Sequence, residues 1–487
     1  MTLARRSLPS PAPRAFVLPA LVAALLAPAS GASDLDLEPR PIASRDGRTY
    51  EAEFGRIEVP ENRSDPESRT ISLAFVRVRS PLADPGPPVF VLAGGPGGSS
   101  IAEVERHVTG GGRMVLELLG GDVIGVDQRG VGESRPNLDT DARFDLSLEE
   151  PGDPARMLEA MRRACREEAA RWRADGVDLD GYTTVESADD LDAVRRALGY
   201  EEVSLWGASY GTHLALATIR RHGEHVARAV LVGPEGPDHT NKLPSATQAG
   251  LELLAAKVKA DPGLGEVIPD LVGLVRTVLE RLEEAPAFVE LDGLRVGVSA
   301  FDVRRWIANH IGLVHGAAVK VPANVLWMAE GDFDAIARDL LEERRDWRIG
   351  SAMSWVMDAS SGGTAARTAR IAREAEECLL RDAVNFPFGD LGDAWGAPDL
   401  GDAYRGPLRA EVPILFIAGD LDSRTPVAHA EELMEHLPNA RLITVENAGH
   451  DVNWAQKELR EAWGAFLAGE EPATTRVVAP PLRFVRP

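Results

Sequence analysis

The chain has 487 residues, of which 44% are hydrophobic and 26% charged, a balance typical of a soluble globular protein with a large core. Its 76 acidic residues outnumber the 53 lysines and arginines, and the net charge of −23 argues against nucleic acid or an anionic membrane surface as a partner. The length allows two or three domains, although α/β enzymes of this size often form one unit.

The N-terminus has the pattern of a cleavable export signal, which we assign to residues 1–32. Basic residues, among them Arg5 and Arg6, precede an apolar run at 15–26, and small residues at 30–32 offer a cleavage site. The apolar run is well short of the ~20 residues that span a membrane. We therefore expect a secreted or periplasmic protein with no stable membrane insertion after cleavage. The sequence leaves the choice between Sec and twin-arginine export open.

Two cysteines are present, Cys165 and Cys378. In an exported protein such a pair can form a disulfide, and two buried free thiols are the alternative. Two cysteines alone make no zinc site, and no ligand cluster or dinucleotide motif accompanies them. We hypothesise a Cys165–Cys378 disulfide and expect no metal and no cofactor.

The chain after the signal begins with strand patterns. Residues 54–60 and 70–78 alternate apolar and polar side chains, as half-buried antiparallel strands do. Apolar runs of the kind found in a buried parallel sheet follow at 89–92, 123–126, 203–206 and 229–232. Two charged helices are predicted between them, at 155–173 and at 187–198, the second with Ser187 as its N-cap.

From about residue 238 to 406 the pattern changes. Helical segments dominate and only one short β-like piece, at 289–298, interrupts them. The predicted helices cover 246–260, 268–284, 301–310, 332–345 and 365–383. Because runs of the buried parallel kind are missing here, we interpret this stretch as a mainly helical cap inserted over the sheet.

The sheet resumes with apolar runs at 412–418 and 441–445, each followed by a helix. Alternation of strands and helices in both halves predicts the α/β class, with a mostly parallel sheet flanked by helices. The expected organisation is a signal peptide at 1–32, a first core part at 33–237, the cap at 238–406, a second core part at 407–470 and a tail at 471–487.

The segment 207–211 reads Gly-Ala-Ser-Tyr-Gly, between a predicted strand and a predicted helix. This is the pattern of a nucleophile elbow, a tight turn that exposes a serine hydroxyl at the top of a sheet. Glycines are needed there because side chains would collide with the neighbouring strand and helix. A chance match in a chain with 46 glycines is the alternative, but the flanking strand and helix favour Ser209 as a nucleophile.

An oxyanion hole is predicted from two places. The elbow points the backbone N–H of Tyr210 at a developing oxyanion. The glycine-rich loop at 93–99 follows a buried strand and is not a phosphate-binding loop, because no Gly-Lys-Ser/Thr follows. We take its Gly95 N–H as the second donor, with Gly94 as the alternative.

Serine needs a base, and the base needs a carboxylate to orient it. Of ten histidines, His450 follows a late strand and a glycine, whereas the others lie on helices, in loops or in the cap. The acid is Asp422 or Asp420, after the strand at 412–418. The order Ser209, Asp422, His450 is that of α/β-hydrolases. Asp127 and Arg129 also end a strand, and we expect them to form a structural ion pair beside the oxyanion hole.

These motifs resemble the exported α/β-hydrolases of the tripeptidyl aminopeptidase and proline iminopeptidase group, serine peptidases of the S33 type. The resemblance rests on 94–99, 127–134, 207–211, 419–426 and the pair 449–450, and it runs from about residue 50 to 470. It implies Ser209, Asp422 and His450 as a catalytic triad and a TAP-like C-terminal region. Ala93 departs from the histidine that proline iminopeptidases usually carry before the glycine loop.

The resemblance implies a secreted serine hydrolase that removes N-terminal residues or short peptides through an acyl-enzyme. The partner would be a peptide or a small acyl substrate, and an esterase or another small-molecule hydrolase on the same scaffold is the alternative. Aminopeptidases of this group hold the substrate ammonium with carboxylates of the cap. Five acids are candidates for that role: Glu235, Glu330, Asp332, Glu376 and Glu377.

Overall fold

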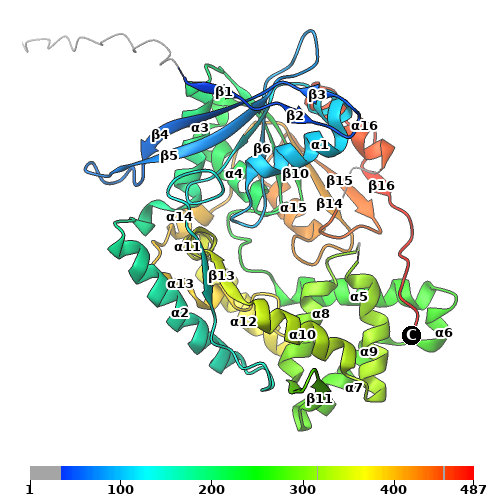
Figure 1. The fold of residues 1–487 in the computed structure, drawn as a ribbon. Coiled ribbons are helices and arrows are strands. Elements are labelled where there is room, and N and C mark those ends of the chain that lie inside the picture. Colours follow the sequence, from blue (N-terminus) through cyan, green and yellow to red (C-terminus); the bar gives the residue numbers. More distant parts are fainter. Residues whose placement is uncertain (1–34, 315, 453–455) are drawn as a thin grey trace, which may run out of the picture. The chain divides into compact units, whose positions relative to one another are not determined.

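A computed structural model describes residues 35–314, 316–452 and 456–487, so the predicted signal peptide lies outside the described residues. The central feature is a sheet with the strand order β1-β4-β5-β7-β6-β9-β10-β14-β15-β16 (Figure 1). Its strands are β1 (Leu37–Pro39), β4 (Ala52–Pro60), β5 (Thr70–Val78), β6 (Val89–Leu92), β7 (Val123–Val126), β9 (Val203–Ala208), β10 (Val226–Val232), β14 (Ile414–Gly419), β15 (Ala440–Glu446) and β16 (Arg476–Val478).

The sheet has an antiparallel start and a parallel remainder. β1, β4, β5 and β7 pair antiparallel in that order, and every later neighbouring pair from β7 to β16 is parallel. A small hairpin of β2 (Ile42–Ala43) and β3 (Thr49–Tyr50) lies apart from it. This is the mostly parallel α/β sheet predicted from the apolar runs.

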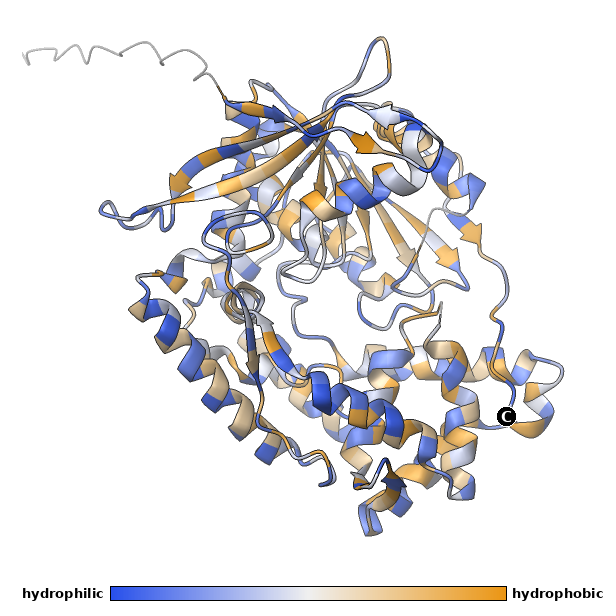
Figure 2. Cartoon of the chain, in the orientation of Figure 1, coloured by the Kyte–Doolittle hydropathy of each residue, from blue (hydrophilic) through white to orange (hydrophobic). Residues whose placement is uncertain are grey.

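The parallel strands are apolar along their length because both faces of the sheet are covered, and Figure 2 shows them in orange. Phe90 and Leu92 face a core shared with α3 (Thr184–Ala197) and α4 (Tyr210–His222). Val89 and Val91 face the opposite core, shared with α1 (Ser100–Leu119) and α16 (Lys457–Leu467). α15 (Val427–Met434) packs on the first of these faces.

Two local predictions were wrong. The N-cap of α3 is Thr183, whose hydroxyl accepts the N–H of Glu186, whereas Ser187 lies buried inside the helix. A threonine at the right place offers the same cap chemistry one turn earlier. The stretch from 471, expected to be a tail, also contributes a strand, because β16 pairs with β15 and forms the edge of the sheet.

The inserted region is mainly helical, as predicted. Its helices are α5 (Pro244–Ala260), α6 (Leu264–Val267), α7 (Leu271–Glu284), α8 (Ala300–His310), α9 (Val321–Glu330), α10 (Asp334–Asp346), α11 (Ala352–Ser361), α12 (Ala365–Glu377), α13 (Gly392–Trp395) and α14 (Gly401–Arg405). The helices from α5 to α10 share a core of their own, whereas α11, α13 and α14 pack into the core shared with α3 and α4. The β-like piece is a hairpin of β11 (Ala287–Leu291) and β12 (Leu294–Val298).

A second piece of chain joins this region. β8 (Asp139–Arg143), which follows β7, pairs antiparallel with β13 (Arg348–Ser351), and α2 (Pro154–Ala174) packs on α13. The Gly297 N–H of β12 also donates to the Glu149 carbonyl at 2.8 Å. The inserted helices are thus anchored to the segment between β7 and α3, which the apolar pattern alone assigned to the core.

The predicted disulfide is absent, because both cysteines are free. Cys165 of α2 is fully buried among core side chains, and burial raises the pKa of its thiol to about 12. Cys378 is half-buried at the C-cap of α12. None of the helices in the described part of the chain has the length and apolar character needed to cross a bilayer.

Candidate active site

Ser209 lies at the turn between β9 and α4. Its φ of 54° and ψ of −127° are rare for a residue with a side chain. The Ser209 N–H donates to the Val232 carbonyl of β10 at 2.9 Å, which ties the turn to the neighbouring strand. This is the geometry expected of a nucleophile elbow, and it puts Oγ at the carboxyl ends of the parallel strands.

The two glycines of the motif stand where no side chain fits. A Cβ on Gly207 would lie 2.5 Å from the Gly211 carbonyl oxygen, and a Cβ on Gly211 would overlap the Leu92 carbonyl oxygen of β6. Both obstacles are backbone atoms, which cannot rotate aside. The glycines are therefore required by the close packing of α4 against β6 and β9.

We expect Gly211→Ala to lower the free energy of unfolding by roughly 3 kcal/mol, because the added methyl group must push α4 away from β6. Gly110→Ala on α1 is a matched control, since a Cβ there meets nothing within 4 Å. The control should leave stability unchanged or raise it slightly. Urea unfolding of both variants measures the difference, and equal midpoints would contradict the steric explanation.

Three predicted site residues meet in one chain of hydrogen bonds. His450 Nδ1 lies 2.9 Å from Asp422 Oδ2, and His450 Nε2 lies 2.9 Å from Ser209 Oγ. Asp422 follows β14 and His450 follows β15, so neighbouring strand ends bring together residues up to 241 positions apart. In this arrangement Nε2 can accept the serine proton while Nδ1–H stays bonded to the carboxylate.

Asp422 is held by its own loop and is 3% exposed. Its Oδ1 accepts the N–H groups of Arg424 and Thr425 at 2.9 and 2.8 Å, and its Oδ2 accepts the Thr425 hydroxyl at 2.6 Å. Burial raises the pKa of this carboxyl, but His450 and the Thr425 hydrogen bonds outweigh burial and hold the pKa below its usual value. The carboxylate is therefore ionised at neutral pH and able to stabilise an imidazolium.

The competing acid, Asp420, faces a different partner. Its Oδ2 lies 3.2 Å from Lys257 Nζ, and that ammonium also donates to Asn447 Oδ1 at 2.8 Å. The hydrogen bonds of the described residues include one from His450 to Asp422 and none to Asp420. The geometry thus favours Asp422, as the loop pattern predicted.

Other histidines occupy packing positions. His213 is buried, with its ring nitrogens bonded to the Gly236 carbonyl and the Tyr404 hydroxyl. Burial lowers the pKa of His213 to about 4. His239 stacks on the buried His429 with ring centroids 4.0 Å apart. His315 lies outside the described residues.

The glycine loop after β6 flanks the serine. A Cβ on Gly94 would lie 3.1 Å from Ser209 Cβ, and Gly95 lines the same cavity as Ser209 and His450. Gly95 has a φ of 126°, which side chains rarely tolerate. Tyr210 is the first residue of α4, and N–H groups of a first helical turn have no partner inside the helix. Their part in an oxyanion hole stays a prediction.

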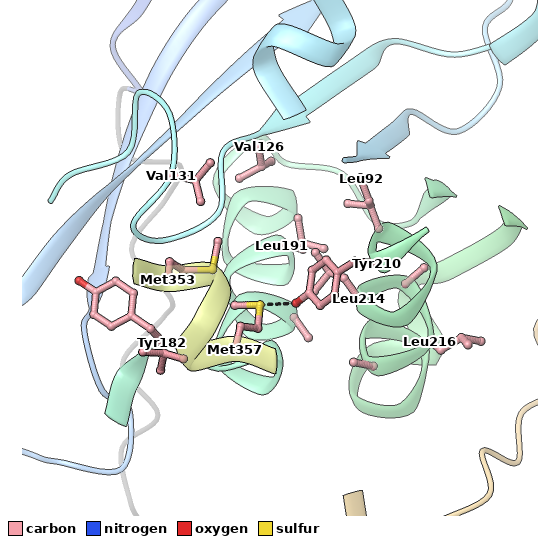
Figure 3. Packing of buried hydrophobic residues seen from close by; sticks show 14 of the residues in the cluster. Leu92, Val126, Val131, Tyr182, Leu191, Tyr210, Leu214, Leu216, Met353 and Met357 are labelled. Atoms are coloured by element: carbon pink, nitrogen blue, oxygen red, sulfur yellow. Dashed lines mark hydrogen bonds between the residues drawn. The ribbon is translucent and has the colours of Figure 1, made fainter. Parts of the chain in front are cut away.

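The Tyr210 side chain points away from Ser209 into the core. Figure 3 shows its ring near Leu214 and Leu191, with the hydroxyl bonded to the sulfur of Met357 on α11. The same hydroxyl lies 3.0 Å from Thr184 Oγ1, and burial raises the pKa of this phenol well above its usual value. Tyr210 can therefore serve the site only through its backbone.

The expected ion pair between Asp127 and Arg129 does not form. The fully buried Arg129 pairs with Asp190 of α3, with nitrogen–oxygen distances of 2.8 Å. Asp127 instead accepts the Ser99 hydroxyl and the Ile101 N–H at the start of α1. The Asp127 side chain is thus bonded to the start of α1 and the Arg129 side chain to α3.

A cavity of about 570 Å³ opens above Ser209. Gly95, Ser209 and His450 line it, together with residues of the inserted region and of the loops that end the sheet strands. Seven charged side chains besides His450 face it: Glu235, Lys242, Arg305, Glu343, Arg348, Asp358 and Arg424. A chain with a net charge of −23 thus places four basic and three acidic groups around its candidate nucleophile.

Most of these charges neutralise one another. Lys242 pairs with Glu235 at 2.5 Å, and Arg305 pairs with Glu343. Arg348 pairs with Asp141 and Asp346 at 3.1 and 2.6 Å. Among the described residues, no side chain hydrogen-bonds or ion-pairs with the carboxylate of Asp358 or the guanidinium of Arg424.

Only one of the five acids proposed for the substrate amine lies at this cavity. Glu235 lines it and is buried, whereas the other four are exposed and do not line it: Glu330, Asp332, Glu376 and Glu377. Sequence reasoning missed Asp358 and Arg424. Asp358 lies inside a helix that carries no recognisable motif, so the sequence offered no signal for it. Arg424 lies inside the motif of the acid loop, two residues after Asp422, and this position was the only sequence feature that could have indicated it.

Comparison with known proteins decides the family. Residues 87–272 match the family model described as alpha/beta hydrolase fold, and residues 394–476 match the model described as TAP-like protein. The chain belongs to the α/β-hydrolase family. The two matched segments contain the elbow and the acid and base loops, and the stretch between them holds most of the inserted helices of this α/β-hydrolase.

The curated relatives have peptidase names. A tripeptidyl aminopeptidase of Streptomyces coelicolor is 30% identical over 184 residues, which are 36% of this chain and 34% of that protein. Serine protease Hip1 of Mycobacterium tuberculosis is 30% identical over 193 residues, 38% of this chain and 36% of that protein. The chain thus spans about a third of the length of the curated relatives it matches. Together with the family, these names support a hydrolase.

Solved structures include a proline iminopeptidase-related protein from Thermus thermophilus, with 20% identity, a TM-score of 0.36 and coverage of 86% of this chain and 99% of that one. An esterase from Thermogutta terrifontis has 16% identity, a TM-score of 0.32 and coverage of 81% and 91%.

Proposed function

We propose that this α/β-hydrolase is an exported serine aminopeptidase that releases N-terminal residues or short peptides through an acyl-enzyme. The observation that carries the serine mechanism is the hydrogen-bonded chain from Asp422 through His450 to Ser209 Oγ, with 2.9 Å at each histidine nitrogen. The peptidase names of the curated relatives and the charges of the cavity support the substrate class. The signal-like N-terminus supports export.

In the proposed first step, Ser209 Oγ attacks the scissile carbonyl while His450 Nε2 takes its proton. Asp422 keeps Nδ1–H oriented and stabilises the imidazolium. The N–H groups of Gly95 and Tyr210 would hold the oxyanion, and one such donor contributes about 3 kcal/mol to the transition state. His450 then protonates the leaving amine, and water releases the acyl group by the same steps in reverse.

The cavity offers an acid for the substrate ammonium. Asp358 of α11 pairs with no basic side chain of residues 35–314, 316–452 and 456–487, and it is half-buried near the Glu235–Lys242 pair. Burial and the neighbouring Glu235 raise the pKa of Asp358 to about 8. An ammonium group would supply the missing positive charge and favour the ionised carboxylate. We therefore assign amine recognition to Asp358, with Glu235 behind it.

Paired substrates test this assignment. The chain should hydrolyse alanyl and tri-alanyl aminomethylcoumarin amides with a free N-terminus at least about 10-fold more efficiently than their N-acetyl forms. Asp358→Asn should remove most of this preference through KM, and the exposed-acid control Glu376→Gln should keep it. Equal rates for free and acetylated amides, together with efficient hydrolysis of p-nitrophenyl esters, would identify an esterase instead.

The same substitution separates function from stability. Because the folded chain keeps the Asp358 proton up to about pH 8, whereas an unfolded chain releases it near 4, the folded state binds more protons between these values. This group therefore lowers stability as the pH rises from about 4 to 8. Asp358→Asn should raise the free energy of unfolding at pH 8 by about 1 kcal/mol or more and change it little at pH 4. A destabilised variant at pH 8 would contradict the raised pKa.

A further inference from the structure

Arg424 is a cation beside the candidate triad that has no side-chain partner in the part of the chain that the structure describes. It lies in the loop between β14 and α15, two residues after Asp422, and it lines the cavity that contains Ser209 and His450. Its Nε is buried and has no hydrogen-bond partner. Arg424 is half-buried, and a guanidinium in that setting, without a side-chain partner among the described residues, can bind a carboxylate that enters the cavity.

The neighbouring acid does not fill that role. Burial lowers the pKa of Arg424, and Asp422 is the acid that opposes this effect. Both oxygens of Asp422 are already engaged, one by two backbone N–H groups and the other by His450 and the Thr425 hydroxyl. Two further acids of the cavity, Glu235 and Glu343, are already paired with Lys242 and Arg305.

Contacts of its backbone N–H and Cγ place the start of the Arg424 side chain close to the candidate triad. The Arg424 N–H donates to Asp422 Oδ1 at 2.9 Å, and its Cγ would lie 3.7 Å from a Cβ on Gly312. The Gly312 carbonyl accepts the His450 N–H at 2.7 Å. The start of the Arg424 side chain thus lies beside the acid of the candidate triad and near the backbone of His450, the residue that would protonate the leaving group.

We propose that Arg424 is a specificity-determining residue that binds a carboxylate on the leaving fragment of the substrate. This inference rests on the proposed peptidase function. A carboxylate reaches that position either as the free C-terminus, when the leaving fragment is one residue, or as an Asp or Glu side chain next to the scissile bond. A guanidinium suits this task because its fork of N–H groups binds both carboxylate oxygens.

The cavity then has two complementary charges that the described chain leaves unpaired. Asp358 is the acid without a base and Arg424 is the base without an acid, while the remaining charges are paired. A short free peptide carries a positive amine at one end and a negative carboxylate at the other. A volume of about 570 Å³ accommodates a ligand of that size. Such a site favours short peptides with both termini free over internal segments of long chains.

Matched substrates test the proposal. Di-alanine and tetra-alanine, each as free acid and as C-terminal amide, cover release of one residue and of three. The tetrapeptide amides Ala-Ala-Ala-Asp-NH₂ and Ala-Ala-Ala-Asn-NH₂ cover the side-chain source. We expect kcat/KM to be roughly 10-fold or more higher for the free acids or for the Asp peptide, mainly through KM.

Arg424→Met should bring this ratio close to one, and Arg424→Lys should restore part of it. Arg409→Met is the control, because Arg409 is exposed and does not line the cavity. Labelling of Ser209 by a fluorophosphonate reports whether the variants keep an intact site. The proposal is overturned if the wild-type kcat/KM values are nearly equal for the carboxylate and amide substrates of both sets. It is also overturned if Arg424→Met still labels with the fluorophosphonate and keeps the wild-type ratio.

Failure of the peptidase function is a separate result. If the chain hydrolyses esters but no free peptide, the comparison is made with 4-acetoxybenzoate and its methyl ester, whose leaving groups differ only in the carboxylate. A preference for 4-acetoxybenzoate that Arg424→Met removes supports carboxylate binding on an esterase. No preference overturns it.

Discussion

Ser209→Ala should lower kcat by about 10,000-fold or more on every substrate that the chain hydrolyses, because the acyl-enzyme cannot form without Oγ. That factor corresponds to about 5 kcal/mol of activation free energy. Binding should be largely retained, since the proposed amine and carboxylate sites at Asp358 and Arg424 do not include the hydroxyl. Turnover of tri-alanyl aminomethylcoumarin amide measures the loss, and the slopes of urea unfolding curves show that the variant folds.

Fluorophosphonate labelling gives the same prediction a second measurement. The probe should label the wild-type chain and fail on Ser209→Ala. Ser354→Ala is the matched control, because Ser354 lines the same cavity but donates its hydroxyl to the Pro96 carbonyl at 2.8 Å. It should still be labelled. Substantial turnover or labelling of Ser209→Ala would rule out this serine as the nucleophile.

Asp422→Asn should lower kcat by about 1,000- to 10,000-fold with little change in KM. An amide in place of the carboxylate presents an N–H to His450 Nδ1 or turns the wrong tautomer toward Ser209, and it cannot stabilise an imidazolium. The Thr425 hydroxyl and the backbone N–H groups at Oδ1 hold the side chain in place, so the variant should fold.

Asp420→Asn is the control for this prediction. It removes a carboxylate of the same loop, but that carboxylate bonds to Lys257 and not to the histidine. Its kcat should stay within about 10-fold of the wild type. If kcat falls more in Asp420→Asn than in Asp422→Asn, then Asp420, and not Asp422, is the acid that orients His450.

Some of the site was accessible from the sequence because its signals are local. Backbone contacts on both sides of the elbow leave no room for side chains at positions 207 and 211. This requirement produces a Gly-x-Ser-x-Gly pattern of five consecutive residues, which can be recognised in the sequence. Asp422 and His450 each follow a buried apolar strand, so parallel pairing alone predicts that their loops lie near the elbow. The order of the three loops along the chain, with Ser209 first, Asp422 second and His450 third, is that of α/β-hydrolases and supported the choice of these residues.

Other features gave no local signal. Asp358 lies within α11, where nothing distinguishes its carboxylate from the many acids on helices exposed to water. Arg129 binds Asp190, 61 positions away, and not the nearby Asp127 as expected. The pairing of β8 with β13 joins segments about 200 residues apart, and short polar strands such as Asp139–Arg143 lack the apolar run that marks a buried strand.

The sequence by itself determined the α/β class, the order of the apolar sheet strands and of the longer helices, and the loops that carry Ser209, Asp422 and His450, because each depends on periodicity or on a turn that few residues permit. Only the tertiary structure decided which charges face Ser209. Side chains of the inserted helices reach the cavity through packing of distant segments, and whether a charge is paired depends on its neighbours in space. The unpaired Asp358 and Arg424, on which substrate choice is proposed to depend, therefore became visible only in the folded chain.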